Sequence, residues 1–205
     1  NVINQESGAT GYTAWEPTYT CILGSDRHPS TDTTANNGPV SNGGVIGLRV
    51  NMTEGTKVVR ITDGTSNTIM VGEQSDWSNP LQTTDIYADI RSSDSRGAFM
   101  GTSHTTQPNG PGSLTQCRGN GTVDRGNNCH RCYNTTTLVW PIGRKVYQFA
   151  SMGDQRCGTP IQSVHPDGAN VLFADGRVIF LSYGIDINTA KNLVVRDDGN
   201  PVNLP

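Results

Sequence analysis

The sequence predicts an α+β fold, with an antiparallel sheet, long loops and one short helix near the C-terminus. An Asp-Gly pair at 175–176 separates two runs of β-branched and aromatic residues, and a helical pattern follows this pair. The composition agrees, because hydrophobic residues make up 33% and charged residues 16% of the 205, while glycine occurs 24 times. Such a composition suits a sheet-rich surface protein more than a helical enzyme.

Residues 169–182 are predicted to form a β-hairpin at the centre of the sheet. A two-residue loop at Asp175-Gly176, with both residues at positive φ, pairs Phe173 with Val178 and Val171 with Phe180. One face of the hairpin then carries Val171, Phe173, Val178 and Phe180, and the other carries Leu172, Ile179 and Leu181. Because both faces are apolar, we expect something to cover each of them.

Shorter patterns predict the remaining elements. Strands are expected at 19–23, 45–50, 57–61 and 68–73, with turn chemistry at 63–67 and further strands at 138–141 and 145–149. Residues 186–196 read as a helix that begins at Asp186 or Asn188, with Ala190, Leu193 and Val194 on its apolar side. We therefore expect a single domain over 1–205 that carries an irregular, cysteine-bearing insertion at about 74–162.

Five cysteines are many for a cytosolic chain of this length: Cys21, Cys117, Cys129, Cys132 and Cys157. They favour disulfides with one odd thiol, and hence an extracellular, cell-surface or cell-envelope location. Four paired cysteines allow three connectivities, and the sequence does not choose among them. The alternative is a zinc site built on the two close cysteines of the insertion, although the spacing lacks a second close pair.

Charge and motifs exclude several classes of function. The formal net charge is −3 and there is no run of Lys or Arg, so nucleic acid is not an expected partner. No segment approaches the length of a membrane span. The sequence also lacks the G-x-S-x-G, H-E-x-x-H and P-loop motifs, and we do not expect an enzyme or a resident cofactor.

Two strings resemble a known family. His165, nine intervening residues and Asp175-Gly176 resemble the His-x9-Asp-Gly signature that closes a large family of bacterial prepilin-like proteins. The string at 61–73, ITDGTSNTIMVGE, is similar to the family's other well-known string and contains Asp63, Gly64, Asn67 and Glu73. A shorter piece, CILGSD at 21–26, is similar to the family's Cys-Pro-Ser-Asp. This family has been filed as a domain of unknown function and also as a solute-binding type.

The resemblance implies a pseudopilin-like head that normally packs on a long N-terminal helix. The chain opens at Asn1-Val2-Ile3-Asn4, so we expect that helix to be absent and one sheet face to need a cover. The implied partners are copies of this chain or other pilin-like subunits. Related major pseudopilins bind calcium, for which the oxygen ligands here would be Asp167, Asp197 and Asp198, but no loop has EF-hand spacing.

The signature residues His165 and Asp175 are not expected to meet. A strand rises about 3.3 Å per residue, which places His165 near the open end of the hairpin and Asp175 at its turn, roughly 20 Å away. We therefore expect Asp175 to shape the turn. The predicted register places His165 across from Asp186, and a contact between these two side chains is the preferred hypothesis.

The sequence supports two functional hypotheses. The first is a non-enzymatic pilin-like or pseudopilin-like subunit of the cell surface or envelope, which assembles through protein–protein contacts. The second is a module that binds extracellular carbohydrate or another large solute through aromatic side chains on its loops. The stacking candidates for the second hypothesis are Trp15, Trp77, Trp140 and Tyr133.

Overall fold

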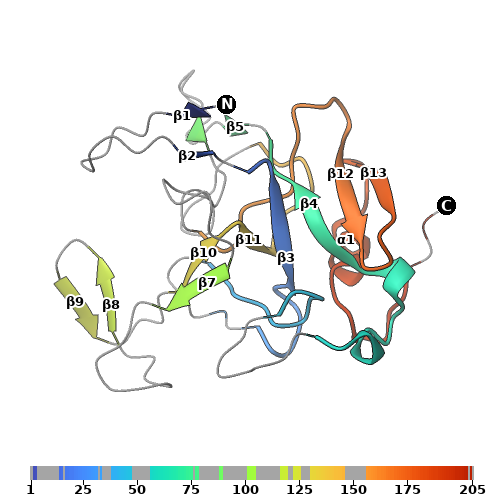
Figure 1. The fold of residues 1–205 in the computed structure, drawn as a ribbon, viewed down its shortest axis with the longest axis horizontal. Helices are drawn as coiled ribbons and strands as arrows, with labels where there is room; N and C mark the ends of the chain where they lie inside the picture. Colours follow the sequence, from blue (N-terminus) through green and yellow to red (C-terminus); the bar gives the residue numbers. More distant parts are fainter. Residues whose placement is uncertain are drawn as a thin grey trace.

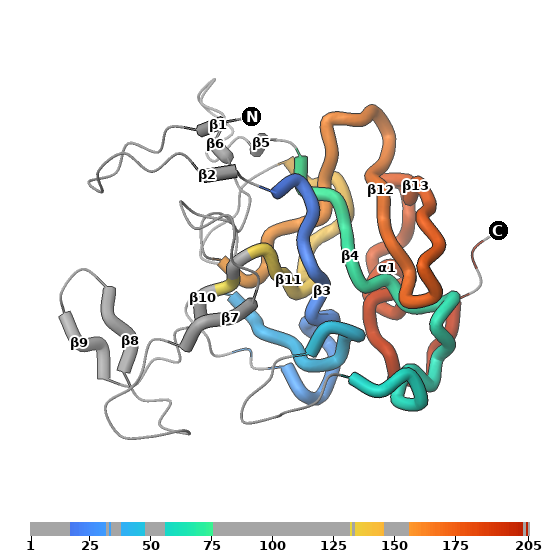
Figure 2. Tube along the Cα trace, in the orientation of Figure 1, coloured from blue at the N-terminus to red at the C-terminus, as the bar shows by residue number. Residues whose placement is uncertain are grey.

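The computed structural model describes residues 17–31, 33, 38–47, 56–75, 130–145, 156–202 and 204, which Figure 2 traces in colour except for part of 130–133. It also gives the backbone of short strands elsewhere in the chain. These strands pair with one another in two-stranded sheets that are separate from the main sheet. These strands are β1 (Val2–Ile3), β2 (Ala14–Trp15), β5 (Trp77–Ser78), β6 (Ala88–Asp89), β7 (Gly101–His104), β8 (Gln116–Gly119), β9 (Thr122–Arg125) and β10 (His130–Tyr133).

The main sheet has five strands in the order β11-β3-β4-β12-β13 (Figure 1). The strands are β3 (Tyr19–Ser25), β4 (Ile69–Glu73), β11 (Thr135–Leu138), β12 (Gly168–Phe173) and β13 (Val178–Ser182). Three of the four pairings are antiparallel, and the α+β prediction is confirmed. The exception is β11, which runs parallel to β3. A long connection rather than a hairpin leads into β11, so its direction is not constrained to be antiparallel.

One face of the sheet packs on the helix α1 (Ile187–Leu193), which Figure 1 shows behind β12 and β13. The core on this side comes from alternate strand residues, the helix and two loop isoleucines: Ile22, Ile69, Leu138, Ile142, Ile161, Ala169, Val171, Phe173, Leu181, Ala190, Leu193 and Val194. Asp186 caps the helix by accepting from the backbone N–H groups of Asn188 and Thr189. The predicted cap and apolar side are confirmed, but the helix ends at Leu193 rather than near residue 196.

The hairpin forms where predicted, but its register differs by one residue. Val178 lies opposite Leu172, not Phe173, and Phe180 lies opposite Asn170. The loop has three residues, because the N–H of Phe173 donates to the carbonyl of Arg177 and that of Gly176 to the carbonyl of Phe173. Only Gly176 has positive φ, at 90°, so the loop is a type I turn followed by a glycine bulge. The prediction of positive φ at Asp175 was wrong.

This register changes which side chains share a face, since a slip of one residue inverts a strand. Ala169, Val171 and Phe173 point with Leu181 into the core. Val178 and Phe180 lie on the opposite face, where 62% and 52% of their surfaces are exposed. The prediction that both faces are covered was therefore wrong, because the second face is only partly shielded.

Three predicted strands are not found in the described residues, since 45–47 and 57–61 are not strands and only Leu138 of 138–141 lies in one, β11. Residues 44–46 form a bend, and 57–61 contain the 3-10 helix η1 (Val58–Arg60). Val58 and Val59 are 71% and 81% exposed, so no neighbouring strand packs on them. A β-branched side chain favours a strand only through such packing, and here local bonds from Arg60 to Lys57 and from Ile61 to Val58 prevail.

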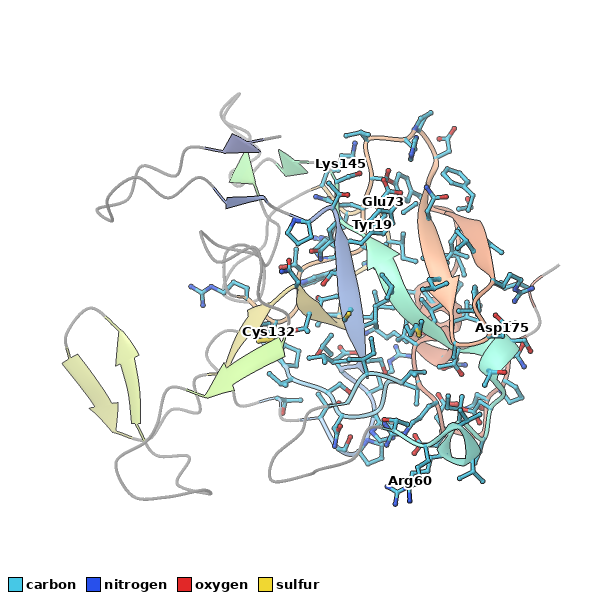
Figure 3. All side chains as sticks on the ribbon, viewed as in Figure 1. Tyr19, Arg60, Glu73, Cys132, Lys145 and Asp175 are labelled. Atoms are coloured by element: carbon cyan, nitrogen blue, oxygen red, sulfur yellow. A yellow bond between two sulfur atoms is a disulfide. The ribbon has the colours of Figure 1, made fainter. Side chains whose placement is uncertain are left out.

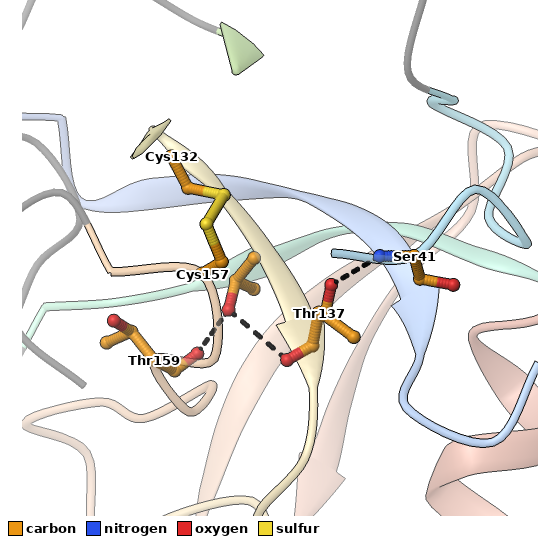
Figure 4. Close-up of a disulfide and its surroundings, with 6 residues drawn as sticks. Ser41, Cys132, Thr137, Cys157 and Thr159 are labelled. Atoms are coloured by element: carbon orange, nitrogen blue, oxygen red, sulfur yellow. Dashed lines mark hydrogen bonds between the residues drawn. A yellow bond between two sulfur atoms is a disulfide. The ribbon is translucent and has the colours of Figure 1, made fainter. Parts of the chain in front are cut away.

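A disulfide between Cys132 and Cys157 supports the other side of β3 (Figure 4). The Cα atoms of the pair are 5.0 Å apart, and both residues are buried in a small cluster with Leu23 and Val40. The neighbouring strand β11 buries three threonines, and the hydroxyls of two of them bond to neighbouring segments. Thr136 Oγ1 donates to the carbonyl of Thr159 at 2.6 Å, and Thr137 Oγ1 accepts from the N–H of Ser41 at 3.0 Å.

Gly168 has no room for a side chain. A Cβ at this position would lie 2.5 Å from the Phe180 ring and 2.6 Å from the carbonyl oxygen of Leu181. We predict that Gly168→Ala lowers the free energy of unfolding by about 2 kcal/mol, because the backbone must shift. Gly184→Ala is the matched control, since its Cβ would lie an ordinary 3.5 Å from the Ser182 hydroxyl oxygen, and it should stay within about 0.5 kcal/mol of wild type. Urea denaturation measures both, and equal losses would contradict the prediction.

The disulfide joins residues 25 positions apart. Closing a loop of this length is expected to stabilise the fold by about 3 to 4 kcal/mol through the unfolded chain. We predict a loss of this size for the double variant Cys132→Ser with Cys157→Ser, measured by urea denaturation. The control Cys21→Ala removes a buried sulfur but no crosslink and should cost about 1 kcal/mol. A double variant as stable as this control would refute the stabilising role.

Candidate functional site

The two signature strings meet at Glu73, the last residue of β4. We call Glu73, Ser75, Ser163, His165 and Asn170 the Glu73 cluster. Glu73 Oε1 accepts from the hydroxyls of Ser75 and Ser163, both at 2.7 Å. Its Oε2 accepts from the backbone N–H and the side-chain amide of Asn170, at 3.0 and 3.1 Å. The cluster thus joins the end of β4, the segment before β12 and β12 itself.

The carboxylate of Glu73 is buried, with 4% of the residue exposed. Burial alone raises its pKa, but the hydrogen bonds from Asn170, Ser163 and Ser75 outweigh this effect and hold the pKa below its ordinary value. The group is therefore an anion at neutral pH with four hydrogen-bond donors around it. Such a carboxylate fastens segments together and has little capacity left to act on a ligand.

His165 lies beside this cluster and not beside Asp186. Its Nε2 is 3.8 Å from Glu73 Oε1, and its ring meets the Phe180 ring edge-on with centroids 6.2 Å apart. Asp186 instead caps α1, so the predicted contact between His165 and Asp186 was wrong. That prediction extended the hairpin register past residue 168, where Asp167 adopts positive φ and the strand ends. With its side chain 51% exposed, His165 is the part of the cluster that reaches solvent.

Asp175 shapes the hairpin turn, as predicted, and lies far from Glu73 in Figure 3. Its carboxylate accepts from the N–H of Arg177 at 2.9 Å, and its own N–H donates to the carbonyl of Thr65. The hairpin tip therefore contacts the string at 61–73 at this point. Within it, Gly64 has φ 99° and precedes the 3-10 helix η2 (Thr65–Asn67), and Asn67 Nδ2 donates to the carbonyl of Asp63. The predicted turn at 63–67 is confirmed.

Asp63 holds the chain that follows α1. Its two carboxylate oxygens accept from the N–H groups of Asp198 and Gly199, at 2.8 and 3.1 Å, and its own N–H donates to the carbonyl of Arg196. Burial, and next the Asp63 carboxyl group close by, raise the pKa of Asp198. The string at 61–73 therefore fixes both the hairpin tip and the C-terminal segment.

The short CILGSD piece contributes an ion pair between β3 and α1. Lys191 Nζ lies 2.7 Å from Asp26 Oδ1 and 3.0 Å from Oδ2, although the lysine side chain is only 8% exposed. An unpaired ammonium group at this depth would be costly, so Asp26 makes its burial tolerable. Asp26 is thus also engaged within the fold.

The other predicted site residues separate into two groups. Cys132 and Cys157 form the disulfide and are not zinc ligands, and Cys21 is a buried thiol outside the disulfide whose pKa is raised by burial. Trp140 is partly buried beneath the guanidinium of Arg144, whose central carbon is 4.8 Å from the ring centroid. The side chains of Cys117, Cys129, Trp15, Trp77 and Tyr133 lie outside the described residues.

The three acids predicted as calcium ligands do not form a metal-binding cluster in the described part of the chain. Asp197 lies 3.0 Å from His28 Nε2, Asp198 is beside Asp63, and Asp167 precedes β12. No group of three or more His, Cys, Asp or Glu side chains among the described residues is arranged to hold a metal ion. Nor is any helix in those residues long and apolar enough to cross a bilayer.

Four residues that bond to the charged or titratable side chains of these segments were not predicted from the sequence. Ser75, Ser163 and Asn170 surround Glu73, and all three could have been found, because Asn170 lies inside the string at 165–176 and each serine lies two residues from the end of a string. The fourth is Ser30, whose hydroxyl is 2.6 Å from His28 Nδ1 while Nε2 faces Asp197. The backbone N–H of Ser30 also points at Nδ1, at 3.2 Å, so this contact closes a local loop. His28 thereby ties that loop to the C-terminal segment.

Comparison with known proteins identifies the family. The family model described as "Protein of unknown function (DUF1559)" matches residues 3–188, and the chain belongs to this family. A search of the curated proteins and a search of the solved structures found no match.

Replacing the Glu73 carboxylate tests its fastening role. We predict that Glu73→Gln lowers the free energy of unfolding at neutral pH by about 2 kcal/mol, because a charged acceptor of four hydrogen bonds is lost. Since the folded pKa lies below the unfolded value of about 4.3, the carboxylate stabilises the fold above that pH and stops doing so as the pH falls through the folded pKa. The variant should therefore lose stability less steeply between about pH 5 and pH 3.

Asp167→Asn is the matched control, because it makes the same change of acid to amide at an exposed residue. It should remain within about 0.5 kcal/mol of wild type at neutral pH. Urea denaturation at a series of pH values measures all three proteins. A Glu73→Gln variant that matches this control at every pH would contradict the role assigned to the carboxylate.

Proposed function

We propose that the chain is a non-enzymatic, pilin-like or pseudopilin-like subunit of the cell surface or envelope, which assembles through protein–protein contacts. The observation that carries this proposal is the partly uncovered second face of the sheet. Val178 and Phe180 on β13 are more than half exposed there, and Tyr19 is half exposed on the same face but on β3, with β4 and β12 in between. Large apolar side chains exposed side by side, as Val178 and Phe180 are on β13, are typical of contact surfaces.

The chemistry of the signature strings supports a structural role. Three of the string acids, Asp26, Asp63 and Glu73, accept bonds or an ion pair from another segment of the fold. A catalytic acid or base would instead be expected in a cleft with a free path to substrate. The Cys132–Cys157 disulfide supports an oxidising location such as the cell envelope or exterior.

Binding of carbohydrate is the second candidate. It draws on Trp140, the stacking candidate whose side chain the structure describes, but the guanidinium of Arg144 lies over that ring. A sugar would have to use the other face of the ring or displace the arginine. The apolar surface on the sheet therefore favours assembly over sugar binding.

Electron microscopy of the native protein tests the proposal. We expect regular filaments or lattices in material purified from its own cells with whatever precedes residue 1. Dispersed particles without regular assemblies, at the concentration found on the cells, would contradict the proposal. A glycan array on the same material would then test sugar binding, and sugar-dependent signals lost in Trp140→Ala would support that second candidate.

A further inference from the structure

The strand β13 forms one edge of the main sheet. Toward β12, the carbonyl of Arg177 accepts from Phe173 and the N–H of Tyr183 donates to Asp167. Because inward and outward groups alternate along an antiparallel strand, the backbone N–H and C=O groups of Val178 and Phe180 point away from β12. None of the hydrogen bonds found in the described residues involves these four groups. The edge is therefore free to pair with another strand.

This edge also lacks the features that normally prevent such pairing. Natural edges carry charges, proline or a bulge, whereas Val178–Ser182 reads VIFLS. The Phe180 ring is held in place although half exposed, since it covers the Cα of Gly168 and meets the ring of His165. A fixed apolar side chain beside unpaired backbone groups loses little conformational entropy when a strand docks.

We propose that β13 pairs antiparallel with β13 of a second copy of this chain, about a two-fold axis at Phe180. This inference rests on the proposed function and specifies one contact of the assembly. The outward-facing residues Val178, Phe180 and Ser182 form a set that is symmetric about Phe180, so one register pairs Phe180 with Phe180 and Val178 with Ser182. Such a self-complementary patch is what an isologous interface requires.

Charge supports a second copy as the occupant. No charged side chain lies within β13, so self-pairing brings no like charges together. The same register places Arg177 across from Tyr183 of the second copy. Tyr183 lies next to Asp167, to which its N–H donates at 2.8 Å, and Asp167 is exposed. The Arg177 guanidinium donates to the carbonyl of Ser66 and lies over the Phe173 ring of its own chain, so at each end of the paired strands this register sets no like charges against each other.

A cysteine at the axis tests the geometry. Residues opposite each other in a hydrogen-bonded antiparallel pair have Cα atoms about 5.5 Å apart, within the range that a disulfide spans. We expect Phe180→Cys to form a disulfide-linked dimer under mild oxidation. Val59→Cys is the matched control, because Val59 is 81% exposed but lies on η1, and it should crosslink no more than wild type. Equal crosslinking of the two variants would overturn the proposal.

A lysine at the axis tests the interaction without a covalent bond. By light scattering, we expect wild type to dimerise at protein concentrations of about 100 µM or below. We expect Phe180→Lys to weaken dimerisation at least about tenfold. Val59→Lys should leave dimerisation unchanged, and circular dichroism checks that each variant is folded. Wild type that stays monomeric, or Phe180→Lys that dimerises like wild type, would overturn the proposal.

The two proposals fail in distinguishable ways. Native assemblies that still form with Phe180→Lys and show no Phe180→Cys crosslink would overturn the β13 contact and leave the assembly function standing. Phe180→Cys dimers in a protein that never forms regular assemblies would support the contact and overturn the assembly function.

Discussion

The fold depends on the buried carboxylate of Glu73. A buried anion is tolerated only when donors surround it, and here the donors come from Ser75, from Ser163 and from Asn170 on β12. These bonds fix where the segment before β12 crosses the end of β4. They consequently position the hairpin, and with it the edge strand β13 and the Phe180 ring.

Two other acids of the signature strings act in the same way at different points of the fold. Asp63 binds the backbone after α1, and Asp26 pairs with Lys191 on α1. Together the three acids connect the sheet, the helix and the C-terminal segment. We interpret the strings as sites that specify the fold, which leaves the outer surface of the domain free to differ in function.

The sequence predicted the elements whose signals are local. The hairpin, the strands β3 and β4, the Asp186 cap and the turn at 63–67 follow from turn residues and periodicity. The hairpin register was not predicted, because two- and three-residue loops can use the same Asp-Gly pair and only the glycine at 176 needs positive φ here. The partner of His165 was missed because Glu73 is distant in sequence, and the two meet only once β4 lies beside β12. The parallel strand β11 could have been suspected from its three consecutive threonines, but not its direction.

Amide hydrogen exchange of the wild-type protein tests the central claim most directly. If Glu73 and Asp63 fasten the fold, the amides that donate to them, those of Asn170, Asp198 and Gly199, exchange only through global unfolding. Gly199 is the most demanding case, because the residue itself is exposed. The account predicts that its amide exchanges as slowly as those of the central strands. Exchange at the rate of an exposed loop amide would contradict the fastening role of these acids.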